Sequence, residues 1–99
     1  MDLHLKDKVV LVTGGSRGIG SAICEAFAAE GAAVTFSYVH SRDKAEALTA
    51  RLQSVYSARV MCMAADMSSE AEVLAMIENV EQSMGVIDIL VNNAAVCPS

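Results

Sequence analysis

An alternation of short apolar runs with helical stretches restricts the fold of this 99-residue chain more than any other feature. Four apolar runs, most of them rich in β-branched residues, are typical of strands: 9–12, 34–39, 60–64 and 87–91. Apolar residues recur at helical spacing in three stretches between them: 19–30, 42–55 and 70–84. The resulting order, βαβαβαβ, predicts an α/β fold in which right-handed helical crossovers join the strands of a parallel sheet.

Two of these stretches also carry signals for a buried face or for helix ends. The stripe of the first stretch, which we expect to face the sheet, consists of Ile19, Ile23, Ala26 and Phe27. In the third stretch, Ser69 and Glu72 have the spacing of a capping box, and Gly85 is a stop signal.

The glycine-rich and polar segments all follow predicted strands. They are residues 13–20, 38–42, 66–67 and 92–95. In the doubly wound strand order 3-2-1-4, the first and fourth strands lie side by side, and ligands bind beyond the carboxyl ends of the strands. We therefore predict a Rossmann-like parallel sheet with a ligand site at that edge.

Composition and charge narrow the class of protein. Apolar residues make up 54% of the chain and charged residues 19%, which excludes a disordered tail and a membrane span. Twelve acidic against seven basic residues give a net charge of -5, which argues against a nucleic-acid partner. A charged N-terminal segment and three cysteines without a CxxC pair lead us to expect a cytoplasmic protein. His4 and His40 are too isolated to predict a metal site.

The glycine-rich loop, residues 13–20 (Thr-Gly-Gly-Ser-Arg-Gly-Ile-Gly), lies between the first predicted strand and the first predicted helix. Gly14 can supply a tight turn, Gly18 lets the backbone approach a pyrophosphate, and Gly20 lets the helix pack closely on the strand. The helix N-terminus behind the loop offers free N–H groups to phosphates. The alternative is a tight strand–helix turn that binds no ligand.

Three motifs, in this order along the chain, resemble those of the short-chain dehydrogenase/reductase family. They are the Thr-Gly-x-x-x-Gly-x-Gly of residues 13–20, the acid after the third strand (Asp66), and the Asn-Asn-Ala-Ala of residues 92–95. The resemblance covers residues 5–95, and the chain looks most like β-ketoacyl-[acyl carrier protein] reductases and glucose-dehydrogenase-like members. It implies that residues 1–99 are an NAD(P)-binding Rossmann domain, truncated before the catalytic segment, with only the first four strands of the sheet.

The resemblance also implies which residues would bind the cofactor. Those of the glycine-rich loop would hold the pyrophosphate: Gly14, Ser16, Arg17, Gly18, Ile19 and Gly20. Asp66, with the backbone of Met67, would orient the adenine. The third motif would contribute Asn93, Ala94 and Ala95, of which the last replaces the usual glycine and could crowd the cofactor ribose. Asp66 could instead be an acid at a helix N-terminus. The asparagines could also be a structural brace, which does not exclude contact with the cofactor.

The end of the second predicted strand bears on the choice of cofactor. No acid precedes Asp43 there, whereas an acid at this place would bind the 2′-hydroxyl of NAD and repel a 2′-phosphate. Arg17 and Arg42 can offer charge-assisted hydrogen bonds to a phosphate, and Ser41 a neutral one. NADP(H) is therefore favoured over NAD(H), although Arg42 could simply cap the next helix or face solvent and Val39 departs from the basic residue of some relatives.

The chain lacks the residues that catalyse carbonyl reduction in that family. Members use a Ser and a Tyr-x-x-x-Lys pair, but neither Tyr38 nor Tyr56 has a lysine four residues later. We therefore expect no catalytic residue here. The expected function is the NADP(H)-binding portion of an oxidoreductase that reduces a carbonyl, such as a 3-oxoacyl thioester or a ketone, by hydride transfer. The alternatives are a free-standing nucleotide-binding or assembly module without catalysis, and a non-functional gene fragment.

The last predicted strand, 87–91, would be left without a neighbour on one side. We expect its edge to expose Ile87, Ile89 and Val91 and to allow self-association. The helices of the family's usual tetramer interfaces lie downstream of this stretch, so that the family tetramer is not expected.

Overall fold

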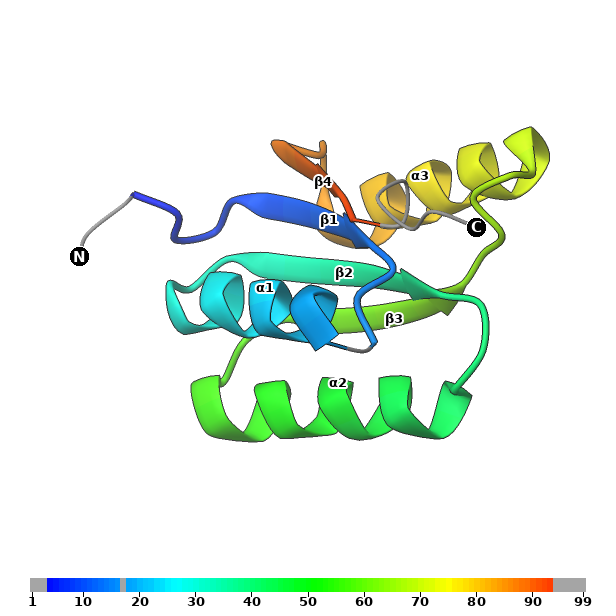
Figure 1. Ribbon diagram of the computed structural model, residues 1–99. Helices are drawn as coiled ribbons and strands as arrows, with labels where there is room; N and C mark the ends of the chain where they lie inside the picture. Colours follow the sequence, from blue (N-terminus) through cyan, green and yellow to red (C-terminus); the bar gives the residue numbers. More distant parts are fainter. Residues whose placement is uncertain (1–3, 17, 94–99) are drawn as a thin grey trace.

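The computed structural model describes residues 4–16 and 18–93, and its elements follow the predicted order (Figure 1). They are β1 (Val9–Thr13), α1 (Gly18–Ala29), β2 (Ala33–Tyr38), α2 (Arg42–Tyr56), β3 (Val60–Ala64), α3 (Glu70–Met84) and β4 (Ile89–Asn92). Every predicted strand and helix is present, and no boundary differs from the predicted one by more than two residues.

The strands form one parallel sheet in the order β3-β2-β1-β4, which confirms the doubly wound, Rossmann-like arrangement. β1 is central: Val10 lies beside Val34 of β2 on one side and beside Ile89 of β4 on the other. Within the part of the chain that the structure describes, β4 pairs with β1 alone. Because all strands run the same way, the segments that follow them emerge at one edge of the sheet.

Two apolar clusters pack on opposite faces of the sheet. Side chains alternate along β1, so that Val10 and Val12 join the cluster formed with α1 and α2, whereas Val9 and Leu11 join the cluster formed with α3. Figure 1 shows α3 apart from α1 and α2, across the sheet. All five residues of β1 are buried, which explains why this strand reads as a continuous apolar run.

The buried face of α1 differs from the predicted stripe. Gly20, Cys24 and Ala28 are buried, Ile23 and Phe27 are partly buried, and Ile19 is 74% exposed. The physical reason is size: small residues along the contact let the helix lie close to the sheet and to the β1–α1 loop. The larger side chains then fall beside the line of contact rather than on it.

The predicted N-cap and stop signal of α3 are both confirmed, but the capping box is only half formed. Ser69 Oγ accepts a hydrogen bond from the N–H of Glu72 at 3.3 Å, and the N–H of Gly85 donates to the carbonyl of Glu81 at 3.1 Å. In a capping box, the Glu72 carboxylate would accept a hydrogen bond from the N–H of Ser69. Here that carboxylate accepts from the N–H of Asp66 at 2.9 Å instead, which ties the start of α3 to the segment after β3.

The edge strand β4 exposes other residues than those predicted. Ile89 and Val91 are partly buried against the cluster on the α1 side, and Ile87 is partly buried against the cluster on the α3 side. The exposed apolar residues are Leu90 and Val86, at 60% and 74%. Because side chains alternate along a strand, Leu90 lies on the α3 side of the sheet, where α3 covers it incompletely.

A cluster of charged and polar side chains joins α1 to α2. Arg51 donates two hydrogen bonds to the Glu25 carboxylate, at 2.9 and 3.2 Å, and the Tyr56 hydroxyl donates a third at 2.7 Å. The bonds from Arg51, followed by the bond from Tyr56, lower the pKa of Glu25 from 4.5 to about 2. Since Arg51 and Glu25 are 50% and 37% exposed, solvent screens this ion pair and its contribution to stability is modest.

Replacing Glu25 by glutamine is expected to lower stability at neutral pH and to leave it nearly unchanged in strong acid. A carboxylate with a depressed pKa stabilises the fold above its unfolded-state pKa, and this contribution is lost as the pH falls through the folded-state pKa. The difference in Tm between the wild type and E25Q, followed by circular dichroism, should therefore shrink between pH 4.5 and about 2. A difference that stays constant over this range would contradict a role for the ionised Glu25.

Candidate functional site

The loop between β1 and α1 is held through Gly14. The N–H of Gly14 donates to Ser37 Oγ at 3.0 Å, and its carbonyl accepts from Asn93 Nδ2 at 2.9 Å. The N–H of Gly15 donates to the carbonyl of Ser37, also at 3.0 Å. Gly14 has a φ of 70°, which glycine adopts without strain, so the predicted tight turn is present. The N–H groups of Gly14 and Gly15 are used within the protein and are not free for a phosphate.

Close contacts account for two further glycines. A Cβ on Gly20 would overlap the carbonyl oxygen of Gly14, which shows that α1 begins against the loop rather than against the strand as predicted. A Cβ on Gly15 would lie 2.5 Å from the Cβ of Phe36 and 2.9 Å from the Sγ of Cys24. The sequence motifs did not assign a role to Gly15. Its only local signal is a second glycine directly after Gly14.

The first turn of α1 is the open part of this loop. Gly18 has a φ of 54°, and a Cβ built on it would meet nothing within 4 Å. The N–H groups of a first helical turn have no partner within the helix, and the positive end of the helix dipole lies there. Gly18 and the exposed Ile19 thus present a surface suited to an anion. Ser16 is partly buried just before this turn, and Arg17 lies outside the described residues.

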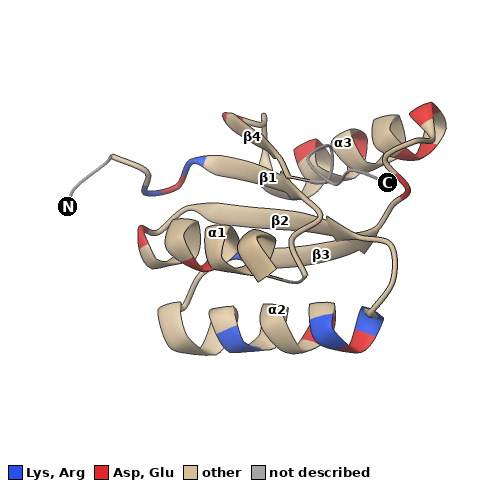
Figure 2. Ribbon diagram, in the orientation of Figure 1, with Lys and Arg blue, Asp and Glu red and all other residues tan. Residues whose placement is uncertain are grey.

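Ser41 and Arg42 lie where β2 leads into α2. Ser41, with a φ of 64°, caps α2 through its carbonyl, which accepts from the N–H of Ala45, and its hydroxyl makes no capping bond. The Arg42 side chain is 76% exposed, and its Nε pairs with Glu46 Oε2 at 3.1 Å, which raises the pKa of Arg42. Figure 2 shows that basic residues lie in this end of α2. The Nη groups of Arg42 lie outside the ion pair.

Asp66 forms a turn before α3. Its Oδ1 accepts from the N–H and from the hydroxyl of Ser68, at 2.9 and 2.7 Å. These bonds lower the pKa of Asp66, with the hydroxyl bond as the larger cause, so the carboxylate is ionised at neutral pH. Asp66 stands before the cap Ser69 and is therefore not in the first turn of the helix. Both bonds use Oδ1, and Oδ2 takes no part in them.

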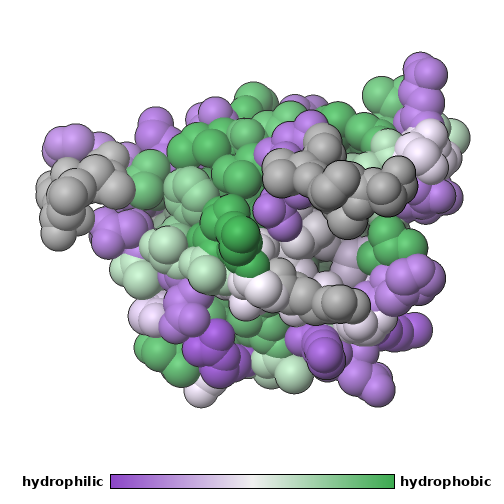
Figure 3. Space-filling view, viewed as in Figure 1, coloured by the Kyte–Doolittle hydropathy of each residue, from purple (hydrophilic) through white to green (hydrophobic). Residues whose placement is uncertain are grey.

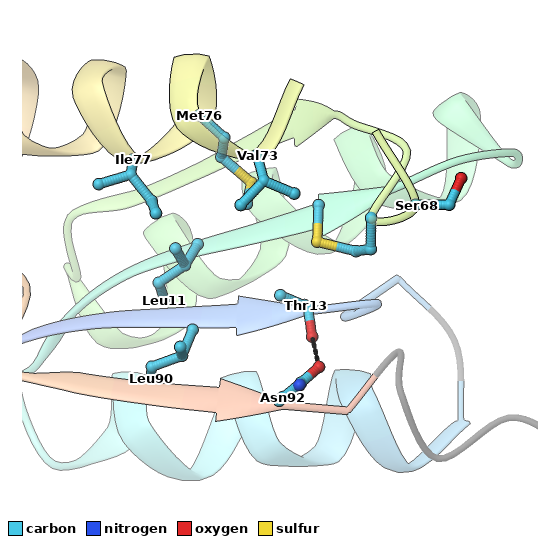
Figure 4. A pocket seen from close by; sticks show the side chains of 9 residues that line it. Leu11, Thr13, Ser68, Val73, Met76, Ile77, Leu90 and Asn92 are labelled. Atoms are coloured by element: carbon cyan, nitrogen blue, oxygen red, sulfur yellow. Dashed lines mark hydrogen bonds between the residues drawn. The ribbon is translucent and has the colours of Figure 1, made fainter. Parts of the chain in front are cut away.

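The asparagine pair braces the ends of β1 and β4. Thr13 Oγ1 lies 3.1 Å from Asn92 Oδ1, to which it donates, and 3.4 Å from the carbonyl of Val91 (Figure 4). Asn93 donates to Gly14, as described above, and so extends the brace to the glycine-rich loop. These bonds support the interpretation of the pair as a structural brace. Ala94 and Ala95 lie outside the described residues.

An apolar cavity of about 400 Å³ opens between α3 and the β1–β4 part of the sheet (Figure 4). Its lining consists of Leu11, Thr13, Met67, Ser68, Val73, Met76, Ile77, Leu90 and Asn92. A mostly apolar lining with a few polar groups is typical of small-molecule sites. Among the described residues that the sequence singled out as cofactor-binding, Met67 alone lines it, because the cavity depends on how α3 lies over the strands.

Charge is unevenly distributed over the described residues (Figure 2). The helix α3 carries glutamates and no lysine or arginine, whereas α2 carries both signs. Within residues 4–16 and 18–93, no three His, Cys, Asp or Glu side chains are grouped so as to hold a metal ion. No helix in this part of the chain is both long and apolar enough to cross a membrane.

The parallel sheet and the glycine-rich β1–α1 loop together define a Rossmann-like α/β protein. The sequence matches the short chain dehydrogenase family over residues 8–99. The chain therefore belongs to this family, which confirms the resemblance found in its three motifs.

Relatives show how much of the family's length the chain represents. The glucose and ribitol dehydrogenase homolog 2 of Arabidopsis thaliana is 44% identical over 92% of this chain and 33% of that protein. The L-sorbose reductase of Gluconobacter frateurii, solved with NADPH and L-sorbose, is 39% identical with a TM-score of 0.87, over 94% of this chain and 35% of that one. The short-chain dehydrogenase/reductase homolog YusS of Bacillus subtilis is 35% identical over 95% of this chain and 85% of that protein. The chain thus spans about a third of the first two and most of the third.

Proposed function

We propose that this chain is the NADP(H)-binding portion of a short-chain oxidoreductase that reduces a carbonyl compound, such as a ketone or a 3-oxoacyl thioester, by hydride transfer. The observation that carries the proposal is the β1–α1 loop. Gly14 is fixed from both sides, Gly20 lets α1 start against it, and Gly18 leaves the helix N-terminus open. Such a loop admits a pyrophosphate to backbone N–H groups. The similar L-sorbose reductase, whose solved structure contains NADPH, supports the choice of cofactor.

In this proposal, residues 1–99 form the cofactor-binding domain, and the dinucleotide lies across the carboxyl ends of the strands. The pyrophosphate is held by the loop and the first turn of α1: Ser16, Arg17, Gly18, Ile19 and Gly20. Gly14 shapes the loop and donates nothing to the ligand. Asp66 Oδ2 accepts a hydrogen bond from the adenine amino group, beside Met67. Asn93, Ala94 and Ala95 lie near the ribose, and the 2′-phosphate is bound by Ser41 and Arg42.

The bound dinucleotide supplies the hydride, and the residues of this chain bind and orient it. Proton delivery needs an acidic tyrosine, and neither tyrosine has a lysine four residues later. Tyr56 is unsuited for another reason: its hydroxyl donates to Glu25, and this bond raises the pKa of Tyr56. We therefore expect no carbonyl reduction by the 99-residue chain alone.

A titration of the 99-residue chain with NADPH and NADH, followed by nicotinamide fluorescence, tests the proposal. We expect saturable binding of NADPH, and no oxidation of it when a ketone or a 3-oxoacyl thioester is added. Binding of neither dinucleotide would overturn the proposal and favour the non-functional fragment. Turnover would overturn the claim that the chain is catalytically incomplete.

A second function, a free-standing nucleotide-binding module without catalysis, is favoured by one observation. The chain spans 85% of the Bacillus relative, which is therefore of comparable length. Both functions predict binding without turnover, but they differ in the polypeptide present in cells. A module would be found at about the 10.4 kDa of this chain, and a cofactor-binding portion within a larger protein.

Replacing Arg42 by alanine is expected to weaken NADPH binding about tenfold or more and to leave NADH binding nearly unchanged. A charge-assisted hydrogen bond contributes about 1.5–3 kcal/mol, and each 1.4 kcal/mol corresponds to a factor of ten. Isothermal titration of both dinucleotides measures the two effects. Lys44→Ala is the matched control, because Lys44 is an exposed cation on the same helix. Equal losses in both variants would show a general charge effect rather than a bond to the 2′-phosphate.

We also propose that the 99-residue chain self-associates through the edge of β4 that is unpaired within residues 4–16 and 18–93. The strand Ile89–Asn92 carries no charge that would discourage pairing, and Leu90 and Val86 are exposed beside it. Figure 3 shows apolar side chains gathered in the part of the surface where β1 and β4 lie.

A further inference from the structure

Ser37, on β2, is a buried polar residue outside the three sequence motifs. Ser37 is 2% exposed, and its Oγ lies 3.0 Å from the backbone nitrogen of Gly14. Its carbonyl accepts the N–H of Gly15 at the same distance. Ser37 thus accepts hydrogen bonds from two consecutive backbone N–H groups, those of Gly14 and Gly15, at the start of the glycine-rich loop.

These contacts determine how the loop is oriented against α1. The carbonyl of Gly14 is bound by Asn93 Nδ2 at 2.9 Å, so that Gly14 is held between β2 and the segment after β4. The same carbonyl oxygen abuts Gly20, where even a Cβ would not fit. Rotation at Gly14 would therefore move this oxygen relative to the first turn of α1. The bond from the Gly14 N–H to Ser37 Oγ opposes that rotation, together with the bond from Asn93.

We propose that Ser37 is a positioning residue for dinucleotide binding. Its hydroxyl fixes Gly14 and thereby sets the first-turn N–H groups of α1 at the place of the cofactor pyrophosphate. The inference rests on the proposed function, because it assigns a role within the same site. Ser37 itself donates nothing to the ligand, and it acts through Gly14.

The proposal predicts an effect confined to one part of the cofactor. Without the hydroxyl, the Gly14 N–H loses its partner and the loop gains freedom, which weakens the cradle for the pyrophosphate. The residues proposed to bind the adenosine part are positioned without Ser37, because Asp66 is bound by Ser68 and Arg42 by Glu46. A ligand without a pyrophosphate should therefore bind independently of Ser37.

The test compares Ser37→Ala with Thr35→Val in the 99-residue chain. Thr35 is a matched control: it is fully buried on the same strand and face, and its hydroxyl bonds to Met84 Sδ rather than to the loop. We expect S37A to weaken NADPH binding about tenfold and to leave binding of adenosine 2′-monophosphate unchanged. T35V should bind both ligands as the wild type does. Calorimetric titration measures all these affinities.

Other outcomes separate the inference from the proposed function. Wild-type affinity of S37A for NADPH, or an equal loss for both ligands, would overturn the role of Ser37 alone. A wild type that binds neither ligand would overturn the proposed function and this inference together. If S37A does not fold, Ser37→Cys keeps the volume with a weaker acceptor, and the same selective loss for NADPH is expected. Faster hydrogen exchange at the Gly14 amide, measured by NMR in either variant, provides a readout without ligand, and unchanged exchange would overturn the inference.

Discussion

The Gly20→Ala variant is expected to lose measurable NADPH binding and about 3 kcal/mol of its free energy of unfolding. The added Cβ would overlap the carbonyl oxygen of Gly14 and would lie 2.8 Å from Gly15 Cα and 2.9 Å from Asn93 Nδ2. Two of these neighbours are backbone atoms, so the loop itself must move to make room. Such a movement breaks the hydrogen bond between Asn93 and Gly14 and displaces the part of the loop where the pyrophosphate is proposed to bind.

Two neighbouring variants separate this crowding from other effects of substitution. Gly18→Ala meets no atom within 4 Å, so it tests the positive φ alone, with an expected cost of about 1–2 kcal/mol. Ser21→Ala removes only a hydroxyl from the same helix and is expected to be nearly neutral. Urea denaturation and NADPH titration are carried out on all variants. If G20A bound NADPH as tightly as S21A, close packing of α1 on the loop would not be required for binding.

The strands and the helix ends could be predicted because they depend on local patterns, whereas the strand order followed from the general rule for doubly wound sheets. The run at 9–12 indicated a strand buried on both faces, and all five residues of β1 are buried. The cap at Ser69 is formed with Glu72, three residues away. Interactions between residues so close in the chain leave their signature in the spacing of residue types.

The contacts that shape the loop could not be predicted in the same way. Ser37 lies 23 positions from Gly14, and Asn93 lies 79 positions from it. Strand register and the path of the chain decide which residue of β2, or of the segment after β4, contacts the loop. Neither can be inferred from a local pattern of residue types. The asparagines were recognised through their motif, whereas Ser37 belongs to none.

The face of α1 was predicted only in part, since Ile23 and Phe27 pack against the core and Ile19 does not. Periodicity assumes that the largest apolar residues face the core, which favours Ile19. At this helix the close approach to the loop demands small residues instead, and Gly20 and Cys24 occupy the contact. A glycine-rich loop before a helix is therefore a sign that the first turns of that helix pack through small side chains.

The Leu90→Lys variant is expected to weaken self-association of the 99-residue chain about tenfold or more. Wild-type chains should associate in a concentration-dependent way, because β4 pairs with β1 alone in the described part of the chain and Leu90 of β4 is 60% exposed. Burying one leucine contributes about 1.5–3 kcal/mol, which corresponds to at least a tenfold change in the dissociation constant. A lysine on an edge strand also discourages pairing with a second strand.

Leu74→Lys provides the control, since Leu74 is an exposed leucine on α3 with a similar exposed fraction of 58%. Sedimentation velocity over a range of concentrations compares the wild type with both variants. If the edge of β4 is the contact, L90K sediments as a monomer where the wild type and L74K are associated. An equal effect of both lysines would show that association follows from general apolar exposure. A monomeric wild type would show that the uncharged edge of β4 alone does not suffice for pairing.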